Sequence, residues 1–246
     1  MIVLCLGMRR SASTLQYNLV RGLVEAAGRG KGVGFVRPGE RSELFDKFEK
    51  WSREAEIYVV KSHKLPPRVD TWSSPRVMGL YIFRDIRGVA GSVKRKSGKS
   101  GKSLLNEIES YIQEEKKIRR MPKLLVQRYE NVTNNITYTC REIESFVGTG
   151  ADDKDIERIA NKFKIENSKE IANRLKYSPA FWFKKMLKKV GLEKKSWYPH
   201  DDKTLLHPNH ITSGEQEKWK ETLTHEEVEA INESFEKWLM EHGYDI

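Results

Sequence analysis

Four short apolar runs stand out along the chain, over residues 2–6, 57–60, 77–83 and 124–126. Continuous apolar runs of this length, each followed by a polar turn, are typical of strands that are buried on both faces of a parallel sheet. Helical periodicity follows the first run over residues 15–27, where leucines recur on one face. The alternation of such strands with helices predicts an α/β fold in which a central parallel β-sheet is flanked by helices, as in the P-loop NTPases.

The second half of the chain is predicted to be helical. Apolar residues recur at helical spacing over residues 136–147, 153–163 and 169–190. Thr224 and Glu227 have the spacing of a capping box, which predicts the start of a last helix that ends before Gly243. No internal repeat or linker divides the sequence, so we expect residues 1–246 to form one domain.

The charge of the chain favours an anionic partner. The 246 residues carry a formal net charge of +10. Nucleic acid, an acidic polysaccharide, a membrane surface or a polyphosphorylated nucleotide would all suit this charge. Residues 94–103, Lys-Arg-Lys-Ser-Gly-Lys-Ser-Gly-Lys-Ser, are the one low-complexity segment and are expected to form a mobile surface loop.

The two cysteines, Cys5 and Cys140, are too few for a disulfide framework and lack the spacing of zinc ligands. No basic region precedes the first apolar run, and no run is long enough to cross a bilayer. We therefore expect a cytoplasmic protein without a transmembrane segment.

The residues that follow the first apolar run are suited to binding phosphate. In open parallel sheets ligands bind beyond the carboxyl ends of the strands. Small residues at a helix N-terminus let backbone N–H groups approach an anion, and hydroxyls and guanidinium groups add donors. This segment comprises Arg9, Arg10, Ser11, Ala12, Ser13 and Thr14. The alternative is a capped helix with surface arginines. A Walker loop is excluded because the glycine and lysine spacing is absent.

The second and third strand ends carry further candidates. Lys61 and His63 follow residues 57–60, where a cation could stabilise a leaving group and an imidazole could accept a proton. Arg84 ends the third run, and Ser92 lies about two helical turns further on, so the pair could hold a second anionic group. The alternatives are a structural histidine and an Arg–Asp salt bridge at the start of the helix that follows the third run.

Taken together, these segments resemble the sulfotransferases that use 3′-phosphoadenosine 5′-phosphosulfate (PAPS). Residues 10–14 resemble the family's phosphosulfate loop, usually Lys-Ser-Gly-Thr-Thr, and residues 61–63 resemble its Lys-Thr-His. Arg84 and Ser92 keep the spacing of its 3′-phosphate contacts. The resemblance continues in order through Arg128–Val132, Ile143–Gly148, Gly214, Trp219-Lys220 and Leu223-Thr224.

The resemblance implies in-line transfer of a sulfuryl group from PAPS to a hydroxyl or amine, without a metal, which leaves adenosine 3′,5′-bisphosphate. Arg10 and Lys61 would stabilise the leaving phosphate, and His63 would take the proton of the acceptor. Residues 9–14 would bind the 5′ end of the donor, and Arg84 with Ser92 its 3′-phosphate. The chain departs from the family pattern at Arg10, where lysine is usual, at Ala12, where glycine is usual, and at Leu15, where many members have an adenine-stacking tryptophan.

Two other functions fit parts of the sequence. One is a nucleotide-binding phosphotransferase such as a kinase, against which the missing Walker loop counts. The other is a non-catalytic polyanion-binding module, whose binding would weaken steeply with salt. We expect no specific nucleic acid partner. Residues 181–189 could form a basic amphipathic helix that touches a membrane, although a core helix with solvated lysines is the more common outcome.

Overall fold

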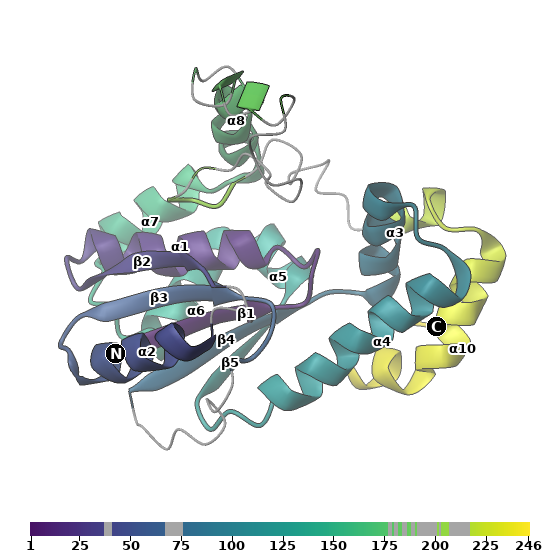
Figure 1. Cartoon of the computed structure of the whole chain (residues 1–246), viewed down its shortest axis with the longest axis horizontal. Helices are drawn as coiled ribbons and strands as arrows, with labels where there is room; N and C mark the ends of the chain where they lie inside the picture. Colours follow the sequence, from purple (N-terminus) through teal and green to yellow (C-terminus); the bar gives the residue numbers. More distant parts are fainter. Residues whose placement is uncertain are drawn as a thin grey trace.

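A computed structural model describes residues 1–36, 41–66, 76–176, 201, 203–206 and 217–246, with scattered positions between 179 and 190. Five parallel strands form one sheet in the order β2-β3-β1-β4-β5 (Figure 1). The strands are β1 (Ile2–Gly7), β2 (Gly30–Phe35), β3 (Ile57–Ser62), β4 (Val77–Phe83) and β5 (Leu124–Arg128). The α/β fold with a central parallel sheet, expected from the apolar runs, is thereby confirmed.

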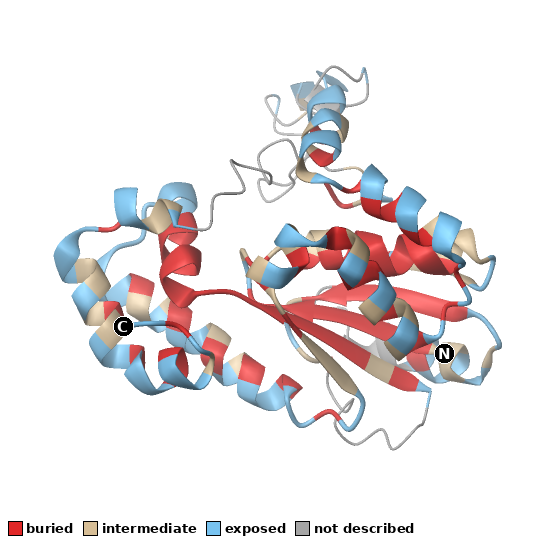
Figure 2. Cartoon of the chain, turned by 180° about the vertical axis from the view of Figure 1, so that it is seen from behind, coloured by how far each residue is buried: buried red, intermediate tan, exposed pale blue. Residues whose placement is uncertain are grey.

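Strand β1 lies at the centre of the sheet, and all six of its residues are buried (Figure 2). In the register, Leu6 pairs with Ser62 of β3 on one side and with Tyr81 of β4 on the other. The carboxyl ends of these three strands therefore lie at one edge of the sheet. The segments that follow them are brought together there, although they are far apart in the sequence.

Helices cover both faces of the sheet because alternate strand residues point to opposite sides. Val3 and Cys5 pack in a core with α1 (Ser13–Ala26), α6 (Ile136–Val147) and α7 (Asp153–Lys162). Leu4 and Leu6 belong to a second core, which includes residues of α2 (Arg41–Arg53), α3 (Ile86–Ser97), α4 (Gly101–Ile118) and α10 (His225–Glu241). Helices α3, α4 and α10 pack together beyond the strand ends (Figure 1). The remaining elements are α5 (Tyr129–Asn134), α8 (Ile165–Lys176) and a 3-10 turn at Lys218–Glu221.

The edge strand β2 was not predicted, because its sequence Gly-Lys-Gly-Val-Gly-Phe is typical of a turn. The glycines instead allow neighbouring atoms of β3 and α1 to lie close to the β2 backbone. A Cβ on Gly30 would lie 1.9 Å from the carbonyl oxygen of Ile57, and one on Gly32 would lie 2.4 Å from Cδ of Arg21. Glycine is thus required for the pairing of β2 with β3 and for its packing against α1. The same glycines make the strand hard to recognise in the sequence.

The basic segment 94–103 is also different from its expected form. It is not a mobile loop: residues 94–97 complete α3, residues 98–100 link the two helices, and residues 101–103 begin α4. Within it, Lys94 is paired with Glu227 at 2.6 Å and Lys99 with Glu107. The predicted capping box of the last helix is present, with Thr224 and Glu227 hydrogen-bonded to each other's backbone N–H groups.

Most of the expected basic amphipathic helix at residues 181–189 lies outside the described residues, as does Gly214. Within the described part of the chain, no helix is both long enough and apolar enough to span a bilayer.

Candidate active site

The turn between β1 and α1 is held tightly against β4. Gly7 admits no side chain, because an added Cβ would lie 2.7 Å from Cβ of Ser13 and 2.8 Å from Cγ2 of Ile82. The Ser11 hydroxyl, which is fully buried, contacts the carbonyl oxygens of Met8 at 2.6 Å and of Ile82 at 2.9 Å. The start of α1 is thereby fixed at the strand edge.

The N-terminus of α1 has the form of an anion site. Arg10 and Ala12 both have positive φ values, 69° and 63°, so the turn alternates in hand around Ser11. Such alternation makes successive backbone N–H groups converge on one side. Ala12 is the N-cap residue and its side chain accepts no hydrogen bond, and the first turn of α1 holds no acidic residue. The partial positive charge of this helix end is therefore not offset by a carboxylate of its own first turn.

Lys61, the fifth residue of β3, places a buried ammonium group beside this helix end. Its Nζ donates a hydrogen bond of 2.6 Å to Oγ1 of Thr14 in the first turn of α1. Burial, together with the charge of Arg10, lowers the pKa of Lys61 to about 8. A bound anion would favour the charged form of this lysine.

His63 follows β3 and is fixed by the turn after β1. Its Nδ1 lies 3.0 Å from the carbonyl oxygen of Gly7. Because a carbonyl only accepts hydrogen bonds, Nδ1 carries the proton and Nε2 keeps its lone pair. Burial, and secondarily the charge of Lys61, lowers the pKa of His63 to about 3. The imidazole is therefore neutral at physiological pH and available as a proton acceptor.

Two arginines and a serine, Arg10, Arg84 and Ser92, contact one another near the strand ends. Nε of Arg10 donates a hydrogen bond of 2.8 Å to Oγ of Ser92, and Nη1 of Arg84 lies 3.4 Å from the carbonyl oxygen of Arg10. Burial and the charges of Arg84 and Arg95 lower the pKa of Arg10. The sequence-based interpretation put Arg10 with the 5′ site, whereas its side chain lies against Ser92. Arg10, predicted for the 5′ site, thus contacts both residues that were predicted for the 3′ site.

Arg84 is buried and its guanidinium group is positioned by two neighbours. Its Cζ lies 4.1 Å from the ring centroid of Tyr129, a cation–π contact. A Cβ on Gly88 would lie 2.9 Å from Nε of Arg84, so glycine leaves room for the guanidinium group beside α3. Tyr129 falls in the segment that resembles the family, but no pattern in the sequence pairs it with Arg84.

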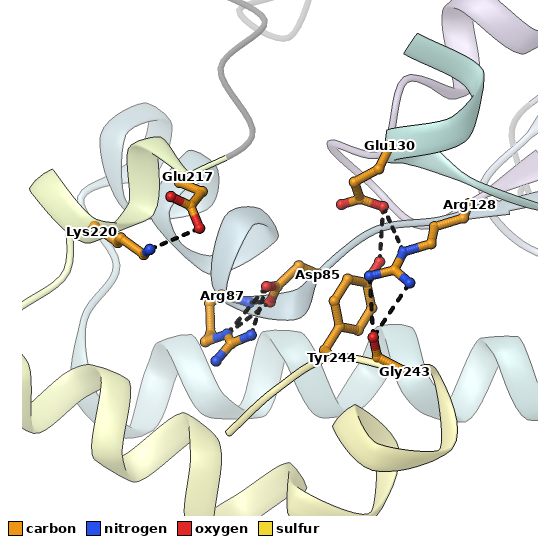
Figure 3. Close-up of polar contacts among 8 residues, drawn as sticks. All are labelled: Asp85, Arg87, Arg128, Glu130, Glu217, Lys220, Gly243 and Tyr244. Atoms are coloured by element: carbon orange, nitrogen blue, oxygen red, sulfur yellow. Dashed lines mark hydrogen bonds and ion pairs between the residues drawn. The ribbon is translucent and has the colours of Figure 1, made fainter. Parts of the chain in front are cut away.

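The alternative of an Arg–Asp ion pair at the start of α3 is present, but its arginine is Arg87 and not Arg84. Asp85 forms a buried ion pair with Arg87 at 2.8 Å and accepts a hydrogen bond from the backbone N–H of Arg87, which caps α3 (Figure 3). The carboxylate of Asp85 is therefore occupied by Arg87.

The C-terminus is tied to the same edge of the sheet. Arg128 pairs with Glu130 at 3.1 Å and donates to the carbonyl oxygen of Gly243 at 3.4 Å, and the Tyr244 hydroxyl donates to Glu130 (Figure 3). These contacts hold the end of the chain beside α5, next to the tyrosine that stacks on Arg84.

A cleft of about 560 Å³ opens beside His63. Gly7, Arg9 and Phe35 contribute to it from the strand ends, and α4 forms the facing wall. We call it the acceptor cleft. The predicted site residues 9–14, Lys61, His63, Arg84 and Ser92 thus lie around one edge of the sheet, and Arg9 also lines this cleft.

Comparison with known proteins identifies the family and supports the fold. The family model of the sulfotransferase domain matches residues 40–243. Retinol dehydratase, solved with androsterone and the inactive cofactor PAP and also with retinol and PAP, superimposes with a TM-score of 0.59 at 16% identity, covering 100% of this chain and 82% of the other. Mouse sulfotransferase SULT7A1 complexed with PAP gives 0.57 at 14% identity, covering 97% and 84%.

No curated protein sequence matches the chain significantly. The turn at residues 7–14 lies before the matched range, so its similarity rests on the fold and on its own residues. The family match covers most of the chain, and the chain belongs to the sulfotransferase family, as its strand-end motifs indicated.

Proposed function

We propose that the protein transfers a sulfuryl group from PAPS to a hydroxyl or amine acceptor. The observation that carries this proposal is the position of His63: a neutral imidazole, whose Nδ1 donates a hydrogen bond to the carbonyl oxygen of Gly7 at the end of β1, lines the acceptor cleft. The structural relatives bear PAP, the desulfated form of the same donor.

The two anion sites fit the two charged ends of that donor. The N-terminus of α1, with Thr14 and Lys61, would bind the 5′-phosphosulfate through backbone N–H groups and an ammonium group. Arg84 and Ser92 would bind the 3′-phosphate, and Arg10 would contact either end by rotation of its side chain. The departure from the family lysine at Arg10 supports this bridging role, because a guanidinium group has more donors than an ammonium group.

In the proposed step, Nε2 of His63 takes the proton of the acceptor while the acceptor oxygen or nitrogen forms a bond to sulfur. The bond from sulfur to the 5′-phosphate oxygen breaks, and its electron pair stays on the phosphate. Lys61 and the N-terminus of α1 stabilise that new charge, so positioning and electrostatics supply most of the rate.

Neither rival function gains support from the described residues. The basic segment 94–103 would be the main surface of a polyanion-binding module, yet Lys94 and Lys99 are paired with carboxylates, and Arg95 donates to Oγ1 of Thr222. A kinase would need carboxylates for Mg²⁺ near the phosphates. The one carboxylate directly after β4, Asp85, is bound to Arg87. The expected cytoplasmic location stays a prediction.

A thermal-shift comparison tests the proposal. We expect saturating adenosine 3′,5′-bisphosphate to raise the melting temperature by several degrees, because a ligand that binds only the native state stabilises it. ATP should act less, and duplex DNA should act only at low salt. Stabilisation by ATP without stabilisation by the bisphosphate would reverse the assignment in favour of a phosphotransferase.

A further inference from the structure

Helix α4 presents two different faces to the molecule. Leu104, Ile108 and Ile112 are buried in the core that includes β1 and α10. The neighbouring face lines the acceptor cleft, and its residues follow the same helical spacing. Glu115 and Ile118, near the end of α4, also line the cleft, and the remaining lining residues of this helix form a polar stripe, which consists of Ser103, Asn106, Glu107, Ser110, Tyr111 and Glu114. Every one of them carries a hydroxyl, amide or carboxylate group.

Two of the carboxylates are fixed in place. Glu107 is half-buried and is bound to Lys99 and to the hydroxyl of Tyr111. Oε1 of Glu114, also half-buried, accepts a hydrogen bond of 2.7 Å from the backbone N–H of Leu65. Glu114 also lies 3.7 Å from Nζ of Lys117. The wall is therefore a preorganised polar surface in which both carboxylates are paired with a lysine.

Phe35 supplies an apolar surface on the opposite side of the cleft. Phe35 ends β2 and is 38% exposed as a residue, and its ring centroid lies 5.5 Å from that of His63. An aromatic face beside the proton acceptor, opposite a wall of hydrogen-bonding groups, suits a ring that is apolar on one face and hydroxylated around its edge. Such a ring is characteristic of a sugar.

We propose that the acceptor is a neutral, polyhydroxylated, sugar-like compound, and this inference rests on the proposed sulfuryl transfer. The Ser103 and Ser110 hydroxyls donate hydrogen bonds within α4, but their lone pairs and the amide of Asn106 still take hydrogen bonds from water. A mainly apolar acceptor would remove these hydrogen bonds, and this costs free energy. Retinol and androsterone, the compounds found in the retinol dehydratase structures, are mainly apolar. The acceptor of this chain differs from them in its polarity.

Sulfuryl transfer from ³⁵S-labelled PAPS tests the inference with four acceptors: methyl β-glucoside, methyl β-lactoside, androsterone and tyramine. We expect kcat/KM for the better glycoside to exceed that for androsterone at least tenfold. A preference for androsterone would overturn the inference, as would a preference for tyramine, which would indicate an amine or phenol site instead.

Variants of the α4 wall connect the preference to this cleft. Asn106→Leu and Ser110→Leu should each lower kcat/KM for the preferred glycoside by about three- to tenfold, the usual value of one neutral hydrogen bond. They should not lower it for androsterone. Gln113→Leu, an exposed position of α4 that does not line the cleft, is the matched control and should change neither value.

The shift in melting temperature produced by adenosine 3′,5′-bisphosphate distinguishes failure of the acceptor inference from failure of the proposed sulfotransferase function. If all variants keep this shift and the label goes to androsterone or tyramine, the acceptor inference is wrong and the sulfotransferase assignment stands. Equal loss of activity with glycoside and androsterone in the leucine variants would also contradict a specificity role. If the wild-type protein shows no shift and transfers no label, both the assignment and the inference fail.

Discussion

Replacement of His63 by alanine is expected to lower turnover by about 10²–10⁴-fold, the usual contribution of a general base. Its affinity for adenosine 3′,5′-bisphosphate should stay within about threefold of the wild-type value, because the neutral imidazole contributes no charge to either anion site. Turnover is measured by label transfer and affinity by calorimetry. His225→Ala, at an exposed position of α10, is the control and should change neither.

The pH dependence adds a second readout for His63. Its pKa of about 3 in the free protein means that it is a proton acceptor across the physiological range. Bound donor brings negative charge close to the ring and favours the imidazolium form, so the pKa in the complex is higher. The acid limb of kcat should therefore lie at higher pH than that of kcat/KM for the donor. Turnover of His63→Ala equal to that of the wild type would remove this residue from the mechanism.

Replacement of Lys61 by methionine is expected to lower turnover by about 10²–10³-fold, the usual cost of one preorganised donor at a developing charge. Methionine keeps an unbranched apolar side chain that reaches as far as Cε and lacks the ammonium group that contacts Thr14. Lys237→Met, on the exposed face of α10, is the control.

The pKa of Lys61 also predicts the alkaline limb of the pH profile. Because the pKa is lowered to about 8, the free protein loses this charge as the pH rises through that value. The value of kcat/KM for PAPS should fall accordingly above pH 8, since this parameter reports the free enzyme. Lys61→Arg stays protonated and should move the limb to higher pH. A flat profile up to pH 10 in the wild-type protein would contradict the role of Lys61.

The strand-end residues were predictable because parallel topology decides where they meet. The apolar runs of β1, β3 and β4 could be recognised without any contact information, and their carboxyl ends necessarily share one edge of the sheet. This is why Lys61 and Arg84 could be predicted to lie at the same edge although 22 residues of sequence lie between them. The topology was sufficient to predict this location, and the functional roles of the two residues stay predictions.

Side-chain partners were less predictable, since they depend on packing. Arg10 lies against Ser92, and Asp85 pairs with Arg87 and not with the adjacent Arg84. Both contacts depend on the local backbone conformation, which the sequence does not reveal. Arg10 has a positive φ, and Asp85 is the N-cap residue of α3. The polar wall of α4 was missed for a related reason. Its residues are those of any solvated helix face until the fold places them opposite His63.

The central claim is that two adjoining positive sites bind the two phosphorylated ends of one nucleotide. The most direct test measures by calorimetry the binding of adenosine 3′,5′-bisphosphate and of AMP, which lacks the 3′-phosphate. The proteins compared are the wild type and Arg84→Met, and Arg158→Met, at an exposed position of α7, is the control. We expect the wild type to prefer the bisphosphate by about 10–100-fold, the value of charge-assisted hydrogen bonds to one phosphate, and Arg84→Met to lose most of this preference while its affinity for AMP is unchanged. Equal affinity of the wild-type protein for the two nucleotides, or an unchanged preference in Arg84→Met, would contradict the account.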